Sequence, residues 1–146
     1  MFLAAGLAAS AGAWGQTCDV SSPTLAFGVY SPLAVAPSRV STTVTVTCRA
    51  TLALLISYRI LLSAGNSGNV QDRWMASGTN RLRYNLYTDP SYSTVWDNTN
   101  GVTGTILLTL LLLNGSDTKI IYGNIPAQQF VPAATYTDSL LITISY

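Results

Sequence analysis

This 146-residue chain contains no histidine and no glutamate, and charged residues of every kind make up only 9% of it. Its six acidic residues are all aspartates, scattered along the sequence. The absence of histidine excludes catalytic triads and metal sites that use imidazole, and the absence of glutamate excludes a glutamate general base. The sequence therefore predicts a protein that is not an enzyme and uses no metal or cofactor.

The scarcity of charge also limits the possible partners. The net charge is +1 and no basic run is present, so nucleic-acid binding lacks the positive surface that it requires. Hydrophobic residues make up 49% of the chain. Weakly charged surfaces repel one another little, which suits molecules that pack side by side.

The two cysteines are Cys18 and Cys48. In a secreted protein such a pair predicts one disulfide, whereas in a reducing compartment it would be two buried thiols. Cys48 shares a strand face with Val44 and Val46, so it should point towards the core. We favour the disulfide, which would close a loop of about 30 residues and stabilise the fold by roughly 3–4 kcal/mol.

Three patterns resemble functional motifs but have simpler explanations. Ser67 lies between glycines, yet the spacing of a nucleophile elbow is absent. Asp89 and Asp97 could form a carboxylate pair, but aspartates beside proline or asparagine are typical of turns. Residues 114–116 form a glycosylation sequon, which we interpret only as a turn.

Alternation of apolar and polar residues predicts β-strands along most of the chain. Residues 39–48 alternate most regularly, and residues 81–87 repeat the pattern. Further strands are predicted at residues 52–62, 92–96, 102–113, 118–122 and 136–146, with a hairpin turn at Asn114-Gly115. About seven or eight regularly spaced strands without helical periodicity indicate an all-β, antiparallel sandwich.

Two leucine-rich stretches break the alternation, at residues 52–56 and 106–113. Neither is long enough to span a bilayer. A strand buried on both faces is the simplest explanation, and an apolar face covered by a neighbouring subunit is the second. A third is that leucine stands at some of these positions in place of another medium-sized residue.

The last predicted strand carries an apolar face. Leu140, Ile142, Ile144 and Tyr146 lie on that face by the two-residue period of a strand. The sequence places no turn or further strand after it. We therefore expect this strand to need a partner, either from elsewhere in the chain or from another molecule.

Residues 1–16 form a separate apolar segment rich in alanine, glycine and leucine. A signal peptide would fit its length and the small residues Ala13 and Gly15, although no Lys or Arg follows Met1. A retained segment would be an extended strand whose two faces are almost equally apolar. Both interpretations stay open, whereas a transmembrane helix is not expected because the run is short of about 20 residues.

Several motifs within residues 17–146 together resemble the spore coat protein U domain, the pilin-type domain of archaic chaperone–usher pili. Their order and spacing carry the resemblance: Cys18, Phe27-Gly28-Val29-Tyr30-Ser31-Pro32-Leu33, Val44-Thr45-Val46-Thr47-Cys48, Ser63-Ala64-Gly65, Arg73-Trp74-Met75, Leu82-Arg83-Tyr84-Asn85-Leu86-Tyr87-Thr88-Asp89, Trp96, Tyr122-Gly123-Asn124-Ile125-Pro126-Ala127-Gln128-Gln129 and Pro132-Ala133-Ala134-Thr135-Tyr136-Thr137-Asp138. Two features depart from the family pattern. Ala134 stands where glycine is usual, and the leucines at 106–113 replace a segment richer in glycine and threonine.

The resemblance implies an incomplete immunoglobulin-like antiparallel β-sandwich that is completed by a donor strand. In that family a periplasmic chaperone first fills the gap, and an N-terminal extension of the next subunit replaces it in the fibre. The acceptor groove is then expected to include Leu140, Ile142, Ile144 and Tyr146. If residues 1–16 are retained, they have about the right length for the donated strand, with the candidate positions Leu3, Ala5, Leu7, Ala9 and Ala11.

We therefore expect a structural subunit of a bacterial surface pilus that serves adhesion and biofilm formation. Its partners would be other pilus subunits, a periplasmic chaperone and an outer-membrane usher, and it would pass through the periplasm to the cell surface with no membrane span in its mature form. The alternative is a tip adhesin or glycan-binding coat domain without its own donor strand. Trp74, Trp96, Tyr87 and Tyr92 could then offer stacking surfaces, although such aromatic residues more often pack in the core.

Overall fold

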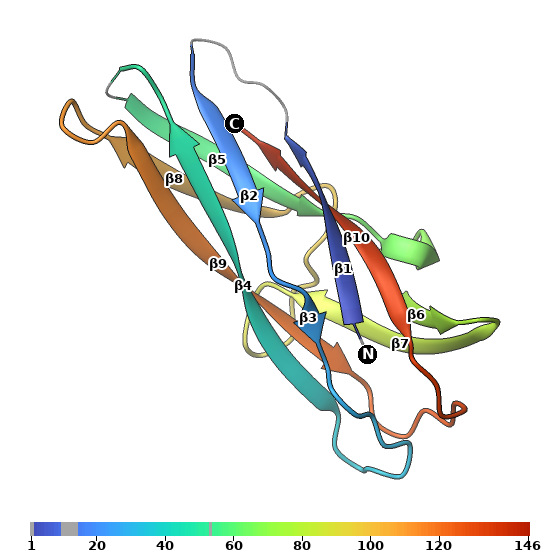
Figure 1. Ribbon diagram of the computed structural model, residues 1–146. Coiled ribbons are helices and arrows are strands. Elements are labelled where there is room, and N and C mark those ends of the chain that lie inside the picture. Colours follow the sequence, from blue (N-terminus) through green and yellow to red (C-terminus); the bar gives the residue numbers. More distant parts are fainter. Residues whose placement is uncertain (1, 10–14, 53) are drawn as a thin grey trace.

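The computed structural model describes residues 2–9, 15–52 and 54–146, and nearly all of the regular structure in these ranges is β-strand (Figure 1). A single short 3₁₀-helix, Gly65–Ser67, is the exception within them. The strands in chain order are β1 Phe2–Ala9, β2 Thr17–Ser21, β3 Leu25–Ala26, β4 Ser38–Arg49, β5 Leu54–Leu62, β6 Arg73–Ser77, β7 Asn80–Tyr87, β8 Val102–Leu108, β9 Asn114–Ile125 and β10 Thr137–Ser145. The all-β class is confirmed.

The strands form two layers of a sandwich. One layer contains β2, β4, β9 and the end of β7, and the other contains β8, β5, β10, β1, β3, β6 and the start of β7. Pairing between the described strands is antiparallel throughout, except that β1 runs parallel to β10. Figure 1 shows β1 and β10 side by side with their arrows in the same direction.

One strand belongs to both layers. The first half of β7 pairs with β6, so that Leu82 lies opposite Met75. The second half pairs with β9, so that Leu86 lies opposite Gly123. Because β6 also pairs with β10 at Ala76 and Thr137, β7 joins the two layers through its own backbone.

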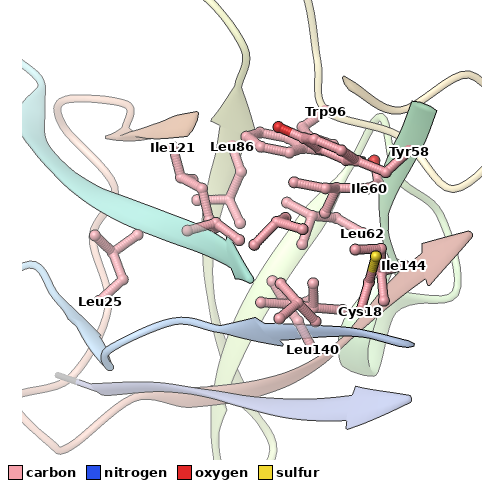
Figure 2. Packing of buried hydrophobic residues seen from close by; sticks show 14 of the residues in the cluster. Cys18, Leu25, Tyr58, Ile60, Leu62, Leu86, Trp96, Ile121, Leu140 and Ile144 are labelled. Carbon is pink, nitrogen blue, oxygen red and sulfur yellow. The ribbon is translucent and has the colours of Figure 1, made fainter. Parts of the chain in front are cut away.

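The core lies between the layers and follows the alternation that the sequence predicts. Val44, Val46 and Cys48 of β4 are buried, while the polar residues between them are more exposed. Leu82, Tyr84 and Leu86 of β7 are buried in the same way. Figure 2 shows side chains from both layers, including Ile60, Leu62, Leu86 and Leu140, gathered in one cluster. The strands predicted at residues 39–48, 81–87 and 136–146 are confirmed.

Two local predictions are wrong. The Asn114-Gly115 turn does not form, because these residues begin β9 and pair with Arg49 and Cys48. The strand predicted at residues 92–96 is only an isolated bridge between Tyr87 and Val95. There the Asp89 carboxylate accepts hydrogen bonds from the backbone N–H groups of Ser93 and Thr94, and those bonds hold a loop.

The prediction that the leucine run at 106–113 is buried on both faces is also wrong. Ile106 and Leu108 face the core, but Leu107 is 66% exposed. The strand then ends, residues 109–112 form a tight turn, and the leucines at 110–113 are exposed. The run is therefore half a strand and half a surface loop. It leaves an exposed apolar surface, for which the second explanation given above was cover by a neighbouring subunit.

The last strand does not lie at an open edge in this structure. Of the two partners expected for this strand, one from elsewhere in the chain and one from another molecule, the structure has the first: β1 pairs with β10 from Phe2↔Thr137 to Ala9↔Ile144. Residues 2–9 of the N-terminal segment form the extended strand β1 in this structure. No helix in the described ranges has the length and hydropathy required to cross a membrane.

Candidate strand-acceptor site

β10 is held along both of its edges, but by very different elements. One edge pairs with β5 from Ile142 to Ser145 and with β6 at Thr137. On the opposite edge, β1 is the one described strand that pairs with β10, over eight consecutive residues. β1 in turn pairs with β3 at Leu25 and Ala26, so it fills the space between β10 and β3. That whole edge of β10 depends on one N-terminal strand for its main-chain partners.

The residues expected to form an acceptor groove line the inner face of β10. Leu140, Ile142 and Ile144 are fully buried, and Tyr146 is half-buried against the same core. Figure 2 shows Leu140 and Ile144 on the strand side that meets residues of the opposite layer. A small cavity of about 10 Å³ remains beside Leu140 and Ile142, lined also by Leu25, Leu62, Leu86 and Ile121.

The candidate donor positions fall in register with these groove residues. Ala5 pairs with Leu140, Leu7 with Ile142 and Ala9 with Ile144. Leu3 pairs with Asp138, one step before the apolar stretch begins. Ala11, the fifth candidate, lies outside the described residues. Every second residue of the N-terminal strand therefore stands opposite an inward-facing position of β10.

The start of β10 is anchored by a buried carboxylate. Asp138 is 2% exposed and accepts hydrogen bonds from the Tyr84 hydroxyl at 2.7 Å and the Asn66 backbone N–H at 2.8 Å. Burial raises the pKa of Asp138 above its ordinary value, against the lowering effect of these donors. Burial, followed by the charge of Asp138, raises the pKa of Tyr84 as well. The pair fixes β10 to β7 and to the 3₁₀-helix.

A buried arginine, Arg73, stands behind this anchor. Its guanidinium donates to the carbonyl oxygens of Ser63 and Trp96 at 2.8 Å each and to Asn85 Oδ1 at 2.8 Å. Burial lowers the pKa of Arg73, and the nearby Tyr84 and Asp138 oppose that shift. Arg73 therefore ties β6 to the end of β5 and to the loop before β8. No local pattern in the sequence indicates this role, because an arginine on a strand ordinarily faces solvent.

The predicted disulfide is confirmed. Cys18 of β2 and Cys48 of β4 are bonded, directly opposite one another in the register, with Cα atoms 4.1 Å apart. Both are buried in the core. The bridge fixes β2, the first strand after the N-terminal segment, to the longest ladder of the sandwich.

The aromatic residues proposed as stacking surfaces separate into two groups. Trp96 is fully buried, and its indole N–H donates to the carbonyl of Ile60. Trp74 is half-buried beneath the guanidinium of Arg81, 4.2 Å from the ring centroid. Tyr87, Tyr92 and Tyr122 do form a surface cluster, with ring centroids 5.6 and 6.2 Å apart along the row. Arg39 covers one face of Tyr92 at 4.2 Å.

The remaining polar candidates have structural roles. Ser67 closes the 3₁₀-helix by donating to the carbonyl of Ala64. Asp89 and Asp97 each accept several hydrogen bonds within their own loops. The hydroxyl of Ser91, followed by the backbone N–H of Ser93, lowers the pKa of Asp89, and the backbone N–H of Gly101 leads in lowering the pKa of Asp97. In the described part of the chain, no three side chains among His, Cys, Asp and Glu come together as a metal site would require.

An immunoglobulin-like sandwich with an N-terminal strand seated beside its last strand defines a class of β proteins, and comparison with known sequences gives the family. The chain belongs to the Spore Coat Protein U domain family, whose model matches residues 4–143. It is 32% identical to Protein U of Myxococcus xanthus, in an alignment that covers 90% of this chain and 79% of that protein.

A solved structure has the same fold. It is the crystal structure of the CsuC–CsuE chaperone–tip adhesion subunit pre-assembly complex from the archaic chaperone–usher Csu pili of Acinetobacter baumannii. One chain of that complex matches with a TM-score of 0.58 and 17% identity over 90% of this chain. This chain spans only 40% of the length of the matched chain, so the likeness concerns one domain's fold.

Proposed function

We propose that this chain is a structural subunit of a bacterial surface pilus and that it polymerises by donor-strand exchange. In the polymer, β1 of one copy takes the position beside β10 of the next copy. In this structure β1 lies beside β10 of its own chain, which we take as the state of a subunit before it joins the polymer.

The observation that carries this proposal is the pairing of β10. Among the described strands, β1 is the one that pairs with the edge of β10 from Thr137 to Ile144, while β5 and β6 hold the other edge. β1 is joined to the rest of the sandwich by a short link before Thr17. An edge strand that is held in place by such pairing can be replaced by the same strand of another molecule.

The partners follow from this mechanism. Between synthesis and assembly the edge of β10 needs a strand, and a periplasmic chaperone would supply it. An outer-membrane usher would then exchange the chaperone for the next subunit and carry the polymer to the cell surface. The family assignment and the fold shared with a chaperone–subunit complex support this route, and adhesion and biofilm formation would be properties of the finished pilus.

The test is to remove residues 1–14 and then to restore them as a separate peptide. We expect the shortened chain to associate or unfold, and a synthetic peptide of residues 1–14 to return a soluble complex with a higher melting temperature. A peptide carrying Ala4→Pro and Ala5→Pro is the matched control. Two adjacent prolines remove backbone donors on both edges of the strand, so this peptide should not restore the fold.

A shortened chain that is a stable monomer and ignores the peptide would overturn the proposal. The intact mass of the protein recovered from the cell surface gives a second check. If residues 1–15 are missing from it, β1 cannot be the donated strand.

The second candidate function is a tip adhesin or glycan-binding coat domain. The cluster of Tyr87, Tyr92 and Tyr122 is the observation that favours it, because Tyr92 is held at a positive φ of 58° at the surface. Against it, the rings pack edge to face on one another and Arg39 already covers Tyr92. Glycan-array binding that disappears in Tyr92→Ala and persists in Trp74→Ala would support this function.

A further inference from the structure

The two ends of the sandwich carry complementary apolar features. At one end, the turn between β8 and β9 exposes residues 110–113, and Leu52 lies in the neighbouring loop after β4. We call Leu52 and residues 110–113 the leucine tip. At the other end, an apolar pocket of about 340 Å³ opens between residues 28–32 and 131–136. Figure 1 shows these segments at opposite ends of the molecule.

The leucine tip is a rigid projection. Thr109 and Leu112 exchange two backbone hydrogen bonds, of 2.9 and 3.0 Å, so Leu110 and Leu111 form the corner of a tight turn. Leu110 is 81% exposed and Leu111 is 99% exposed. Turn corners are normally occupied by Gly, which adopts positive φ, or by Asn, Asp or Ser, whose side chains hydrogen-bond the local backbone. Leucine offers neither property, and an exposed apolar pair at a turn corner marks a contact with another molecule.

The pocket offers a matching cavity. Its lining includes Val29, Leu82, Val131, Pro132 and Tyr136. No charged side chain is among the described residues that line it, and residues 107–115 at the other end carry no charge either. Joining the two surfaces therefore buries apolar groups without leaving a charge unpaired.

The tip cannot reach the pocket of its own molecule. The ladder of β4 and β9 runs the length of the sandwich, from Ser38↔Ile125 at the pocket end to Arg49↔Asn114 at the tip end. Twelve residue pairs at about 3.3 Å each place the ends roughly 36 Å apart. Only a second copy can bring a tip to a pocket, and such a contact is head-to-tail and repeats along a row.

We propose that the leucine tip of one copy inserts into the pocket of the next copy and forms the rigid joint between neighbouring subunits of the filament. This inference rests on the proposed function. It also specifies a direction for strand exchange. β2 begins at the tip end, where Thr17 pairs with Arg49, so a donor subunit presents its own tip end to the recipient. The pocket of the recipient lies at the Thr137 end of its β10. The donor's tip meets this pocket when the donated strand runs antiparallel to the recipient's β10. Within this chain, by contrast, β1 runs parallel to β10.

The test is a cross-link between two single-cysteine chains. Leu111→Cys and Ala133→Cys place thiols on the tip and on the pocket wall, and both native cysteines are already in the buried disulfide. The two chains are mixed, polymerised and oxidised. We expect about tenfold more disulfide-linked dimer than from Thr103→Cys mixed with Ala133→Cys, since Thr103 is exposed on β8 away from the tip.

Matched variants sharpen the result. Leu110→Asp in the Leu111→Cys chain should abolish the cross-link, because it brings a charge into an apolar pocket. Val35→Asp removes an apolar side chain that is 83% exposed and lies outside the pocket lining, and it should leave the cross-link unchanged. Melting temperatures of all five variant chains should match the parent, since each change is at an exposed position.

The outcomes separate this inference from the proposed function. Polymers that form without the cross-link between positions 111 and 133 overturn the joint and leave strand exchange standing. A cross-link between two copies of Leu111→Cys overturns it as well, since it would place tip against tip. If no polymer forms from the parent chain under any condition, both the proposed function and the joint fall.

Discussion

At the scale of single residues, Gly101 and Gly78 share a backbone conformation but not an environment. Both have a φ of +59°, which is left-handed and costs an alanine about 1 kcal/mol. A methyl group at Gly78 meets nothing within 4 Å, whereas at Gly101 it would overlap the carbonyl oxygen of Ile60. We expect Gly101→Ala to lower the free energy of unfolding by about 1–3 kcal/mol more than Gly78→Ala, as measured in urea. Equal losses would show that the loop at Gly101 moves away freely.

Two aspartates should respond to pH in opposite directions. Burial raises the pKa of Asp138, so its stabilising contribution is complete below the unfolded pKa and is lost as pH rises through the folded value. Hydrogen bonds, led by the one from the Gly101 backbone N–H, lower the pKa of Asp97. Its contribution is present above the unfolded pKa and is lost as pH falls through the folded value.

Replacement by asparagine makes this contrast measurable. As pH rises, Asp97→Asn should lose stability relative to the parent below about pH 4, and Asp138→Asn should gain it above about pH 4. Urea unfolding at a series of pH values gives both trends. Trends of the same sign in the two variants would mean that one of these assignments is wrong.

Residue-level pattern identified much of the candidate site before the structure did. Leu140, Ile142 and Ile144 alternate on β10, and the period of a strand is enough to place them inward. The anchors behind them could not be found in this way. Arg73 is buried because five carbonyl and amide acceptors converge on it from four separate segments, and no local pattern reports acceptors that lie far away in sequence.

At the scale of elements, β2 and β4 depend on their disulfide. The bridge joins residues 30 apart in sequence, at directly opposed positions of the ladder. We expect the Cys18→Ala, Cys48→Ala double variant to lose about 3–4 kcal/mol of unfolding free energy. Denaturant unfolding of this variant beside the parent measures the loss. A loss below about 1 kcal/mol would show that the reduced, unfolded chain is already compact around these strands.

Elements with clean alternation were predictable, and elements set by distant contacts were not. Residues 39–48 could only be a half-buried strand, and β4 is one. The turn expected at Asn114-Gly115 lies instead at Leu110 and Leu111, because β9 continues its pairing with β4 up to Asn114. The position of β1 in the fold could not be predicted from sequence. Both of its faces are apolar, and its place is set by pairing with β10, which is far away in sequence.

At the scale of the whole molecule, the acceptor site should tolerate a strand of either direction. The chain for testing this lacks residues 1–14 and carries the sequence of residues 2–9 after Tyr146, joined by a linker of roughly five residues that forms a hairpin with β10. Antiparallel pairing is slightly more stable per residue than parallel pairing. We expect this fused chain to be a monomer that melts at or above the temperature of the parent and adds to no polymer.

The same fusion with the Ala4→Pro and Ala5→Pro changes in the appended strand is its control. It should behave as the shortened chain does, because its backbone cannot complete the ladder. A fused chain no more stable than this control would restrict the site to the parallel direction, and size-exclusion chromatography with thermal melting distinguishes the two cases.

The crossing of β7 between the layers determines how the sandwich comes apart. Since its first half is bonded to β6 and its second half to β9, neither sheet can melt while the other keeps its full ladder. Most sandwiches hold their sheets together by side-chain packing alone, and packing can loosen gradually. Here the continuous backbone of β7 joins the two sheets, so unfolding of one sheet is accompanied by unfolding of the other in a single cooperative step. A subunit under tension would stay intact until it fails as a unit, with no half-open form from which strands could mispair.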